Sequence, residues 1–258
     1  MNKNIERPIA ALTMFTKLPL WKIFPNISGE SYRHVVTWWP FAGWITGVFC
    51  GGLYLLLSLR LPSFPSAFLA IGGRLLLSGG YHEDGLADFF DGFGGGTSKE
   101  KILTIMKDSH IGTYGVIALI IFIGTFVSLM SSLPPYIGAL MIICADPWSK
   151  FCSGRMLSFL EYARKDATAK NLAAYPRPTA PDTCIALCFA AIPIILTCIY
   201  LSQLVIPVIC GVIVSCITTA FLLIFMKKKI GGYTGDCCGA VYLIAELAFC
   251  LFFTISYQ

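Results

Sequence analysis

The sequence predicts an all-α protein, a polytopic integral membrane bundle of about seven transmembrane helices with its active site on the cytoplasmic face. Composition is the first observation behind this prediction. Of the 258 residues, 56% are hydrophobic and only 13% are charged, and the mean hydropathy is +0.74. In soluble domains about a quarter of the residues are charged. Because a soluble chain of this length still needs a polar surface, the composition argues against a soluble globular protein.

A series of apolar segments is the second observation. A helix needs about 20 residues to cross a bilayer. Segments near this length occupy residues 34–59, 66–80, 113–133, 136–160, 183–200, 204–226 and 238–256. The second is short and contains Arg74, so it is expected to be re-entrant or to pack against its neighbours. Residues 1–33 are predicted to form a cytoplasmic or interfacial segment, and 1–258 a single membrane domain. The lipid bilayer is an expected partner, and a homo-oligomer is left open.

The distribution of basic residues is the third observation, and it predicts the orientation. Basic residues gather before the first apolar segment and after the second, fourth and sixth; they are Lys3, Arg7, Lys17, Lys22, Arg33, Lys99, Lys101, Lys107, Arg164, Lys165, Lys170, Arg177, Lys227, Lys228 and Lys229. The other connections carry only Arg60. This alternation predicts that the N-terminus and three connections are cytoplasmic and that the C-terminus is outside. Nucleic acid is not an expected partner, because no basic stripe with interleaved aromatic residues occurs.

Residues 79–96, GGYHEDGLADFFDGFGGG, concentrate acidic residues between apolar segments. Asp84, Asp88 and Asp91 are spaced four and three residues apart, so on a helix their carboxylates share one face. Such like charges need a neutralising partner, and oxygen ligands in this number suit Mg²⁺ or Mn²⁺ bound with substrate phosphates. An inert acidic turn is the alternative, but these charges are costly beside a bilayer. Residues 84–112 are therefore the predicted catalytic connection.

Polar residues elsewhere extend the candidate site. His82 is either a proton acceptor, an orienting group or a purely structural histidine. In residues 105–115, IMKDSHIGTYG, Lys107 can neutralise a phosphate, and Asp108 can bind metal or position a base. The alternative for this segment is a surface turn that ends a helix.

Two more groups have both a functional and a structural interpretation. Thr234, Gly235 and Asp236 lie in a glycine-rich turn after three lysines, a composition that can cradle an anion but also occurs in flexible loops. Asp146 and Lys150, four residues apart, either pair with each other inside the bilayer or bind substrate.

These motifs together resemble the cobalamin synthase family, the adenosylcobinamide-GDP ribazoletransferases. The resemblance rests on ALTMFTKLPL (11–20), WPFAG (39–43), HEDGLADFFDG (82–92), IMKDSHIGTYG (105–115), YAR (162–164) and GGYTGDCCGA (231–240). The match runs nearly end to end, and the combination of motifs in this order is more specific than any one of them.

The resemblance implies a reaction and a site. Adenosylcobinamide-GDP and α-ribazole, or its 5′-phosphate, would give adenosylcobalamin, or its phosphate, and GMP, with Mg²⁺ as cofactor, in the cytoplasmic membrane of a bacterium or archaeon. By resemblance the metal-binding acids are Asp84, Asp88 and Asp91, with Glu83 and Asp108 as further candidates; the groups around the substrates are Lys107, Ser109, Arg164, Thr234, Gly235 and Asp236; and Asp91, Asp108 or His82 accepts the proton of the attacking hydroxyl. Asp84→Ala, Asp88→Ala and Asp91→Ala are each expected to abolish turnover without affecting membrane insertion.

Two other functions remain as alternatives. A CDP-alcohol phosphotransferase would share the acidic motif, but Ala87 is followed by Asp88 where that pattern requires arginine. A cation-coupled transporter would suit the intramembrane charges Arg74, Asp146 and Lys150, but it should have internal repeats, and the sequence contains none.

Overall fold

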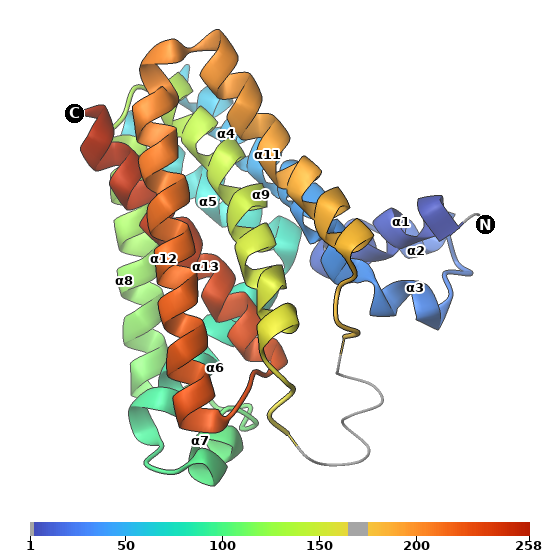
Figure 1. Cartoon of the computed structure of the whole chain (residues 1–258). Coiled ribbons are helices and arrows are strands. Elements are labelled where there is room, and N and C mark those ends of the chain that lie inside the picture. The colour runs from blue at the N-terminus through green and yellow to red at the C-terminus, as the bar shows by residue number, and fades with distance from the viewer. Residues whose placement is uncertain (1–2, 165–174) are drawn as a thin grey trace.

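A computed structural model describes residues 3–164 and 175–258, and Lys165 and Lys170 of the basic connections lie outside this part. Within it the chain is helical, and the only bridge of β type pairs Tyr162 with Tyr233. The helices, shown in Figure 1, are α1 (Lys3–Phe15), α2 (Leu20–Ile23), α3 (Gly29–Arg33), α4 (Trp39–Ser58), α5 (Ser63–Ser78), α6 (Tyr81–Gly95), α7 (Lys99–Ile105), α8 (Thr113–Ser131), α9 (Pro135–Phe159), α11 (Ala180–Tyr200), α12 (Val205–Ile230) and α13 (Gly235–Tyr257). Short 3₁₀ turns, η1 (Val35–Trp38) and η2 (Ser202–Leu204), precede α4 and α12. The all-α prediction is confirmed.

Five helical segments in the described part are long and apolar enough to cross a membrane: Val35–Ser58, Thr113–Ser131, Ala180–Tyr200, Ser202–Ile230 and Gly235–Tyr257. Five of the expected apolar segments are thus confirmed as candidate spans. The other two are also helical but differ from these in length or polarity. Helix α5 has only 16 residues, and α9 has 25 but buries Asp146 and Lys150. A count of seven spans therefore remains a prediction.

Small residues bring α4 and α9 together in the middle of the bundle (Figure 1). Gly43, Gly47 and Gly51 recur every fourth residue and so lie on one face of α4. A Cβ atom on Gly43 would lie 2.8 Å from Cα of Pro147, and one on Gly51 would lie 3.0 Å from the carbonyl oxygen of Ala139. Close backbone approach through small residues is the usual way in which membrane helices pack.

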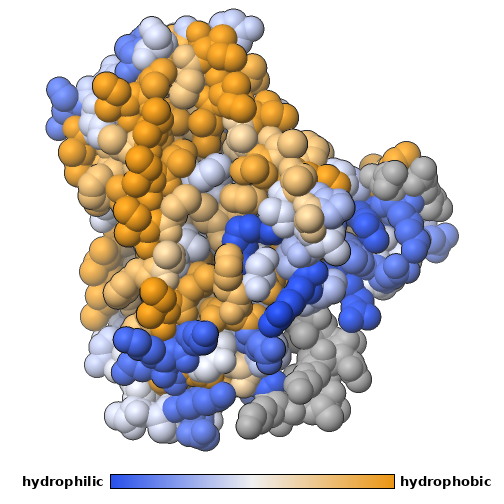
Figure 2. All heavy atoms as spheres, in the orientation of Figure 1, coloured by the Kyte–Doolittle hydropathy of each residue, from blue (hydrophilic) through white to orange (hydrophobic). Residues whose placement is uncertain are grey.

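The outer surface of the long helices is apolar. Along α12 the large hydrophobic side chains that are exposed are Ile206, Ile209, Ile213, Ile217, Phe221 and Ile224, a stripe with helical periodicity. Figure 2 shows hydrophobic residues covering most of the bundle, with hydrophilic residues gathered at its lower end and over the N-terminal helices. An exposed apolar surface of this extent is typical of contact with lipid.

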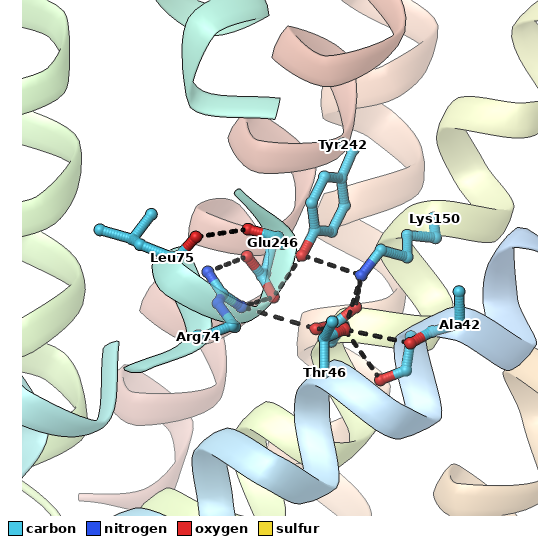
Figure 3. A network of polar contacts seen from close by, with 10 residues as sticks. Ala42, Thr46, Arg74, Leu75, Lys150, Tyr242 and Glu246 are labelled. Atoms are coloured by element: carbon cyan, nitrogen blue, oxygen red, sulfur yellow. Dashed lines mark hydrogen bonds and ion pairs between the residues drawn. The ribbon is translucent and has the colours of Figure 1, made fainter. Parts of the chain in front are cut away.

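Four charged residues are buried inside the bundle and neutralise one another (Figure 3). Arg74 of α5 forms two hydrogen bonds to Glu246 of α13, with N–O distances of 2.6 and 3.1 Å, and its Nη1 lies 3.6 Å from Asp146 of α9. Lys150 pairs with Asp146, which confirms the pairing predicted from their spacing. Thr46 of α4 donates to Asp146 and accepts from Lys150. The network joins four helices and leaves no net charge in the apolar core.

Candidate active site

Helix α6, which carries the acidic motif, lies at the lower end of the bundle (Figure 1). Gly79 and Gly80 have φ values of +73° and +68°, a conformation that favours glycine, and they make the tight turn from α5 into α6. Helix α6 contains Asp84, Asp88 and Asp91, which confirms the expectation that they lie on one helix. This turn places α6 directly after the apolar helix α5, at the lower end of the bundle, where α7 also lies.

Two glycines let α6 and α13 touch backbone to backbone. A Cβ atom on Gly85 of α6 would lie 2.9 Å from the carbonyl oxygen of Asp236, and one on Gly239 of α13 would lie 2.9 Å from that of His82. This close contact brings Asp236, in the first turn of α13, beside the aspartates of α6.

The pKa of Asp88, at this crossing, is raised to about 7. Loss of water is the largest cause, and the negative charges of Asp236, Asp84 and Asp91 add to it, while Arg164 acts in the opposite direction. Asp84 is exposed and Asp88 is partly exposed, so both remain accessible to a ligand. Because the negative charges outnumber the one nearby arginine, the site has an excess of negative charge that a divalent cation would compensate.

The segment with Arg164 is fixed next to this site by a short backbone pairing. The amide of Tyr233 donates to the carbonyl oxygen of Glu161 over 2.9 Å, and the amide of Ala163 donates to that of Tyr233 over 2.8 Å. Gly232 is required here, because a Cβ atom would lie 2.0 Å from the oxygen of Glu161. Arg164 Nη2 then lies 3.4 Å from Asp236 Oδ2, and the buried Arg164 Nε has no partner in the described residues. A guanidinium so placed can bind a phosphate.

Asp91, in contrast, is held by the start of α8. Its two oxygens accept hydrogen bonds from the amides of Gly112 and Gly115, over 2.7 and 2.9 Å. A Cβ atom on Gly112 or Gly115 would lie only 2.4 or 2.5 Å from an oxygen of Asp91, so both positions need glycine. The carboxylate therefore stabilises the N-terminus of α8 and ties it to α6.

The connection between α7 and α8 is exposed. Asp108 accepts through Oδ1 from the amide of His110 and lies 2.7 Å from its Nδ1, and this pairing lowers the pKa of Asp108. Lys107 and Ser109 are exposed beside it. Among the described residues, no hydrogen bond or ion pair joins these three residues to the carboxylates of α6.

His82 and Glu83 point away from the exposed carboxylates. His82 is 2% exposed and lies among the rings of Phe15, Trp39 and Tyr242. Burial lowers its pKa well below the usual range, and the charges of Lys150 and Arg74 act in the same direction. Glu83 is buried as well, and loss of water raises its pKa.

The turn residues of α13 cap the helix. Thr234 is buried, and its Oγ1 accepts from the amide of Cys237 and donates to Asp236 over 3.2 Å. Gly235 is open, since a Cβ atom there would meet nothing within 4 Å. Thr234 therefore orients Asp236, while Gly235 leaves space next to it.

Comparison with known proteins decides the family. The cobalamin-5-phosphate synthase family matches residues 7–254. The chain belongs to this family. A relative from Leptospira interrogans, named adenosylcobinamide-GDP ribazoletransferase, is 33% identical over 100% of this chain and 99% of the relative. Relatives of the same name from Pseudoalteromonas atlantica and Vibrio parahaemolyticus are 32% and 31% identical over 99% of this chain and 93% and 94% of the relatives. No solved structure matches the chain.

In this member of the cobalamin-5-phosphate synthase family, motifs far apart in the sequence meet at one end of the bundle. Residues 82–92 lie on α6, residues 105–115 lead into α8, and residues 162–164 and 231–240 are joined by the backbone pairing. Among residues 3–164 and 175–258, no three His, Cys, Asp or Glu side chains stand ready to hold a metal ion. A pair of carboxylates still fits Mg²⁺, because Mg²⁺ commonly binds one or two carboxylates and takes its other ligands from water and substrate phosphates.

Sequence reasoning overlooked several residues of this region. Glu246 was not predicted to pair with Arg74, 172 residues away in the chain. Phe15, Trp39, Tyr81 and Tyr175 line a small cavity with His82. Phe15 and Trp39 lie in family-like segments and Tyr81 lies in residues 79–96, but sequence reasoning assigned none of them a role.

Proposed function

We propose that this chain transfers the adenosylcobinamide-phosphate group of adenosylcobinamide-GDP to α-ribazole, or to its 5′-phosphate, and releases GMP. Membership of the family supports this reaction, and so do the names of relatives that match the chain end to end. The structural observation that carries the proposal is the crossing of α6 and α13, where Asp84 and Asp88 meet Asp236 and Arg164. A diphosphate bound there would have carboxylates for its metal and a guanidinium for its charge.

Asp84 and Asp88 are the residues that would hold Mg²⁺. Both are accessible. The pKa of Asp88 is raised mainly by loss of water and further by the neighbouring carboxylates, whose repulsion a cation would relieve. Bound with the substrate diphosphate, Mg²⁺ would offset the negative charge that develops on the departing GMP. Asp91, Glu83 and Asp108 were also predicted as ligands. The contacts of Asp91 and the burial of Glu83 give the pair Asp84 and Asp88 the stronger case.

The other residues of the site have roles in binding and positioning. Arg164 would bind a phosphate oxygen, and Lys107 and Ser109 would approach the substrates from the exposed connection. Asp236, oriented by Thr234 and Arg164, would hold the ribose of the incoming alcohol. Asp108 would accept the hydroxyl proton, since the oxygens of Asp91 already accept amide hydrogen bonds and His82 is buried.

We also propose that α5 and α9 cross the membrane together with the five apolar segments. Seven spans would place the basic connections and α6 on the cytoplasmic side and the C-terminus outside. The buried ion pairs support a membrane position for α9, because its two charged residues are neutralised inside the bundle.

The same ion pairs weaken the case for a transporter. Arg74, Asp146 and Lys150 bind one another, Glu246, Thr46 and Tyr242, and none of them is more than 3% exposed. The residues that favoured transport in the sequence therefore have a structural explanation.

Product formation by the purified full-length protein tests the proposed function. The protein in lipid nanodiscs would receive adenosylcobinamide-GDP and α-ribazole with Mg²⁺ or with EDTA, and GMP and adenosylcobalamin would be followed by chromatography. Equal amounts of both products, formed only with Mg²⁺, are expected. Folded protein that forms neither product, but releases CMP from a CDP-alcohol, would contradict the proposal.

A further inference from the structure

A groove on the outer surface of the bundle runs between the end of α9 and the last turns of α12. The two helices lie side by side in Figure 1 and pack against each other. The groove has a volume of about 370 Å³, and it is lined by Phe159, Leu160, Ala220, Leu223, Ile224 and Lys227. Pockets that bind small molecules commonly have volumes of about 300–1,000 Å³. The groove is therefore large enough to hold part of a lipid molecule.

The small side chain of Ala220 creates this groove on the exposed face of α12. Ala220 lies between Ile217 and Ile224, which are three and four positions away on the same helix face. These two isoleucines are 62% and 58% exposed, so they stand above Ala220 on either side. Phe159, which is 69% exposed, borders the groove from α9. The hollow is apolar over about two helical turns, about 10 Å, and this shape and chemistry suit a hydrocarbon chain.

Lysines lie at one end of the groove only. Lys227 is exposed and lines the groove, and the exposed Lys228 and Lys229 follow it at the end of α12. Lys99 reaches the same helix end, because a Cβ atom on Gly231 would lie 3.3 Å from its Nζ. Within residues 3–164 and 175–258, none of these four lysines has a carboxylate oxygen within 4.0 Å. Their positive charges are thus free to attract an anionic group.

The position of the lysines is explained only partly by the helix itself. Positive side chains stabilise the C-terminal end of a helix, and they are common at the cytoplasmic ends of membrane spans. Neither effect requires an apolar groove that ends at Lys227. The acidic residue next to the groove, Glu161, is paired with Arg177 over 3.2 Å and is not among the lysines' partners. The groove therefore combines an apolar floor with an unneutralised positive end.

We propose that this groove binds an anionic phospholipid of the surrounding bilayer. One acyl chain lies along α12 from Lys227 toward Ala220, and the lipid phosphate lies at Lys227. Charge complementarity selects this occupant, because basic pockets between membrane helices attract anionic headgroups, while the positive group of a zwitterionic lipid offsets its phosphate. The inference does not depend on the proposed reaction, since it rests only on the groove and its charges.

Lipid binding to the full-length protein tests the inference. Native mass spectrometry in a neutral detergent would follow titration with phosphatidylglycerol or with phosphatidylcholine that carries the same acyl chains. Wild-type protein is expected to bind the first phosphatidylglycerol at least about fivefold more tightly than phosphatidylcholine, the effect of one lysine near an anionic lipid surface. Lys227→Gln is expected to lose most of this preference. The Tm of each variant in phosphatidylcholine nanodiscs checks that it is folded.

Two pairs of variants separate the groove from general surface effects. Lys22→Gln is the control for Lys227→Gln, because Lys22 is also exposed but lies on α2, far from α12 in Figure 1. It should keep the wild-type preference. Ala220→Phe places a ring in the groove and should weaken phosphatidylglycerol binding. Ile209→Phe changes the exposed face of α12 three turns away and should not.

Equal affinity of wild-type protein for the two lipids would overturn the inference, and this result does not depend on the folding of any variant. A preference that Lys22→Gln and Lys227→Gln reduce equally would also overturn it, since net charge and not the groove would then be responsible. Unchanged phosphatidylglycerol binding in folded Ala220→Phe would show that the acyl chain lies elsewhere.

Discussion

Individual aspartates of the acidic helix differ in what surrounds them, although their spacing places them on one face. Asp84 is exposed, Asp88 is partly exposed among other carboxylates, and Asp91 is bound by two amides at the start of α8. The spacing predicted the shared helix face, because helical periodicity is a local property. It could not predict the partner of Asp91, which comes from residues 21 and 24 positions later.

The different surroundings predict different effects of the same substitution. Asp91→Asn should lower the free energy of unfolding by about 1–2 kcal/mol, because the charge at the N-terminus of α8 is lost. Asp84→Asn should abolish Mg²⁺-dependent turnover without lowering stability, since it removes only an exposed, repelled charge. Thermal unfolding and GMP release of both variants in nanodiscs check this. Equal loss of stability in the two variants would contradict the distinction.

The raised pKa of Asp88 predicts that the stability of the metal-free protein depends on pH. Its pKa is raised from 3.8 to about 7, so the folded chain binds this proton more tightly than the unfolded chain does. The stabilisation is therefore complete below pH ~4 and is lost as the pH rises through about 7. With EDTA present, the Tm of wild-type protein should fall over this range more steeply than that of Asp88→Asn. Parallel Tm profiles for the two proteins would contradict the assignment.

At the scale of elements, glycines decide which helices can approach each other. The glycines of the motifs have separate reasons: Gly85 and Gly239 allow the crossing of α6 and α13, and Gly115, in the first turn of α8, leaves room for Asp91. The sequence shows where the glycines lie. Which backbone approaches them depends on the packing of distant helices, and spacing along the chain does not contain that information.

Gly85→Ala tests the crossing of α6 and α13. The added Cβ would lie 2.9 and 3.1 Å from backbone atoms of Asp236, so the helices must separate. Overpacking of this kind costs about 1–3 kcal/mol, and a displacement of about 1 Å at the site would lower kcat about 100-fold. Gly124→Ala on α8 is the control, because a Cβ there meets nothing within 4 Å. If Gly85→Ala retained the turnover of Gly124→Ala, the proposed contact would not be important for the site.

At the scale of the whole molecule, the bundle is an apolar exterior around a neutral polar centre. The composition predicted the membrane class and the helices, because both follow from average hydropathy and its distribution. The pair of Asp146 and Lys150 was also predictable, since its members are one helical turn apart. The pair of Arg74 and Glu246 depends on the meeting of α5 and α13 and was not predictable from local spacing.

This buried network predicts strong coupling between its members. Glu246→Leu should destabilise the protein by about 3–5 kcal/mol, because Arg74 would remain buried with only the longer contact to Asp146. Arg74→Met combined with Glu246→Leu should be less destabilising than Glu246→Leu alone. Thermal unfolding of the single and double variants measures this coupling. Additive effects of the two substitutions would contradict it.

Release of GMP by wild-type protein and by Asp88→Asn, side by side in nanodiscs, is the most direct test of the acidic site as the centre of ribazole transfer. Both proteins would receive adenosylcobinamide-GDP, α-ribazole and Mg²⁺. The account predicts Mg²⁺-dependent GMP release by the wild type and a loss of at least about 100-fold in the variant, with the variant's Tm maintained. GMP release by Asp88→Asn at the wild-type rate would contradict it.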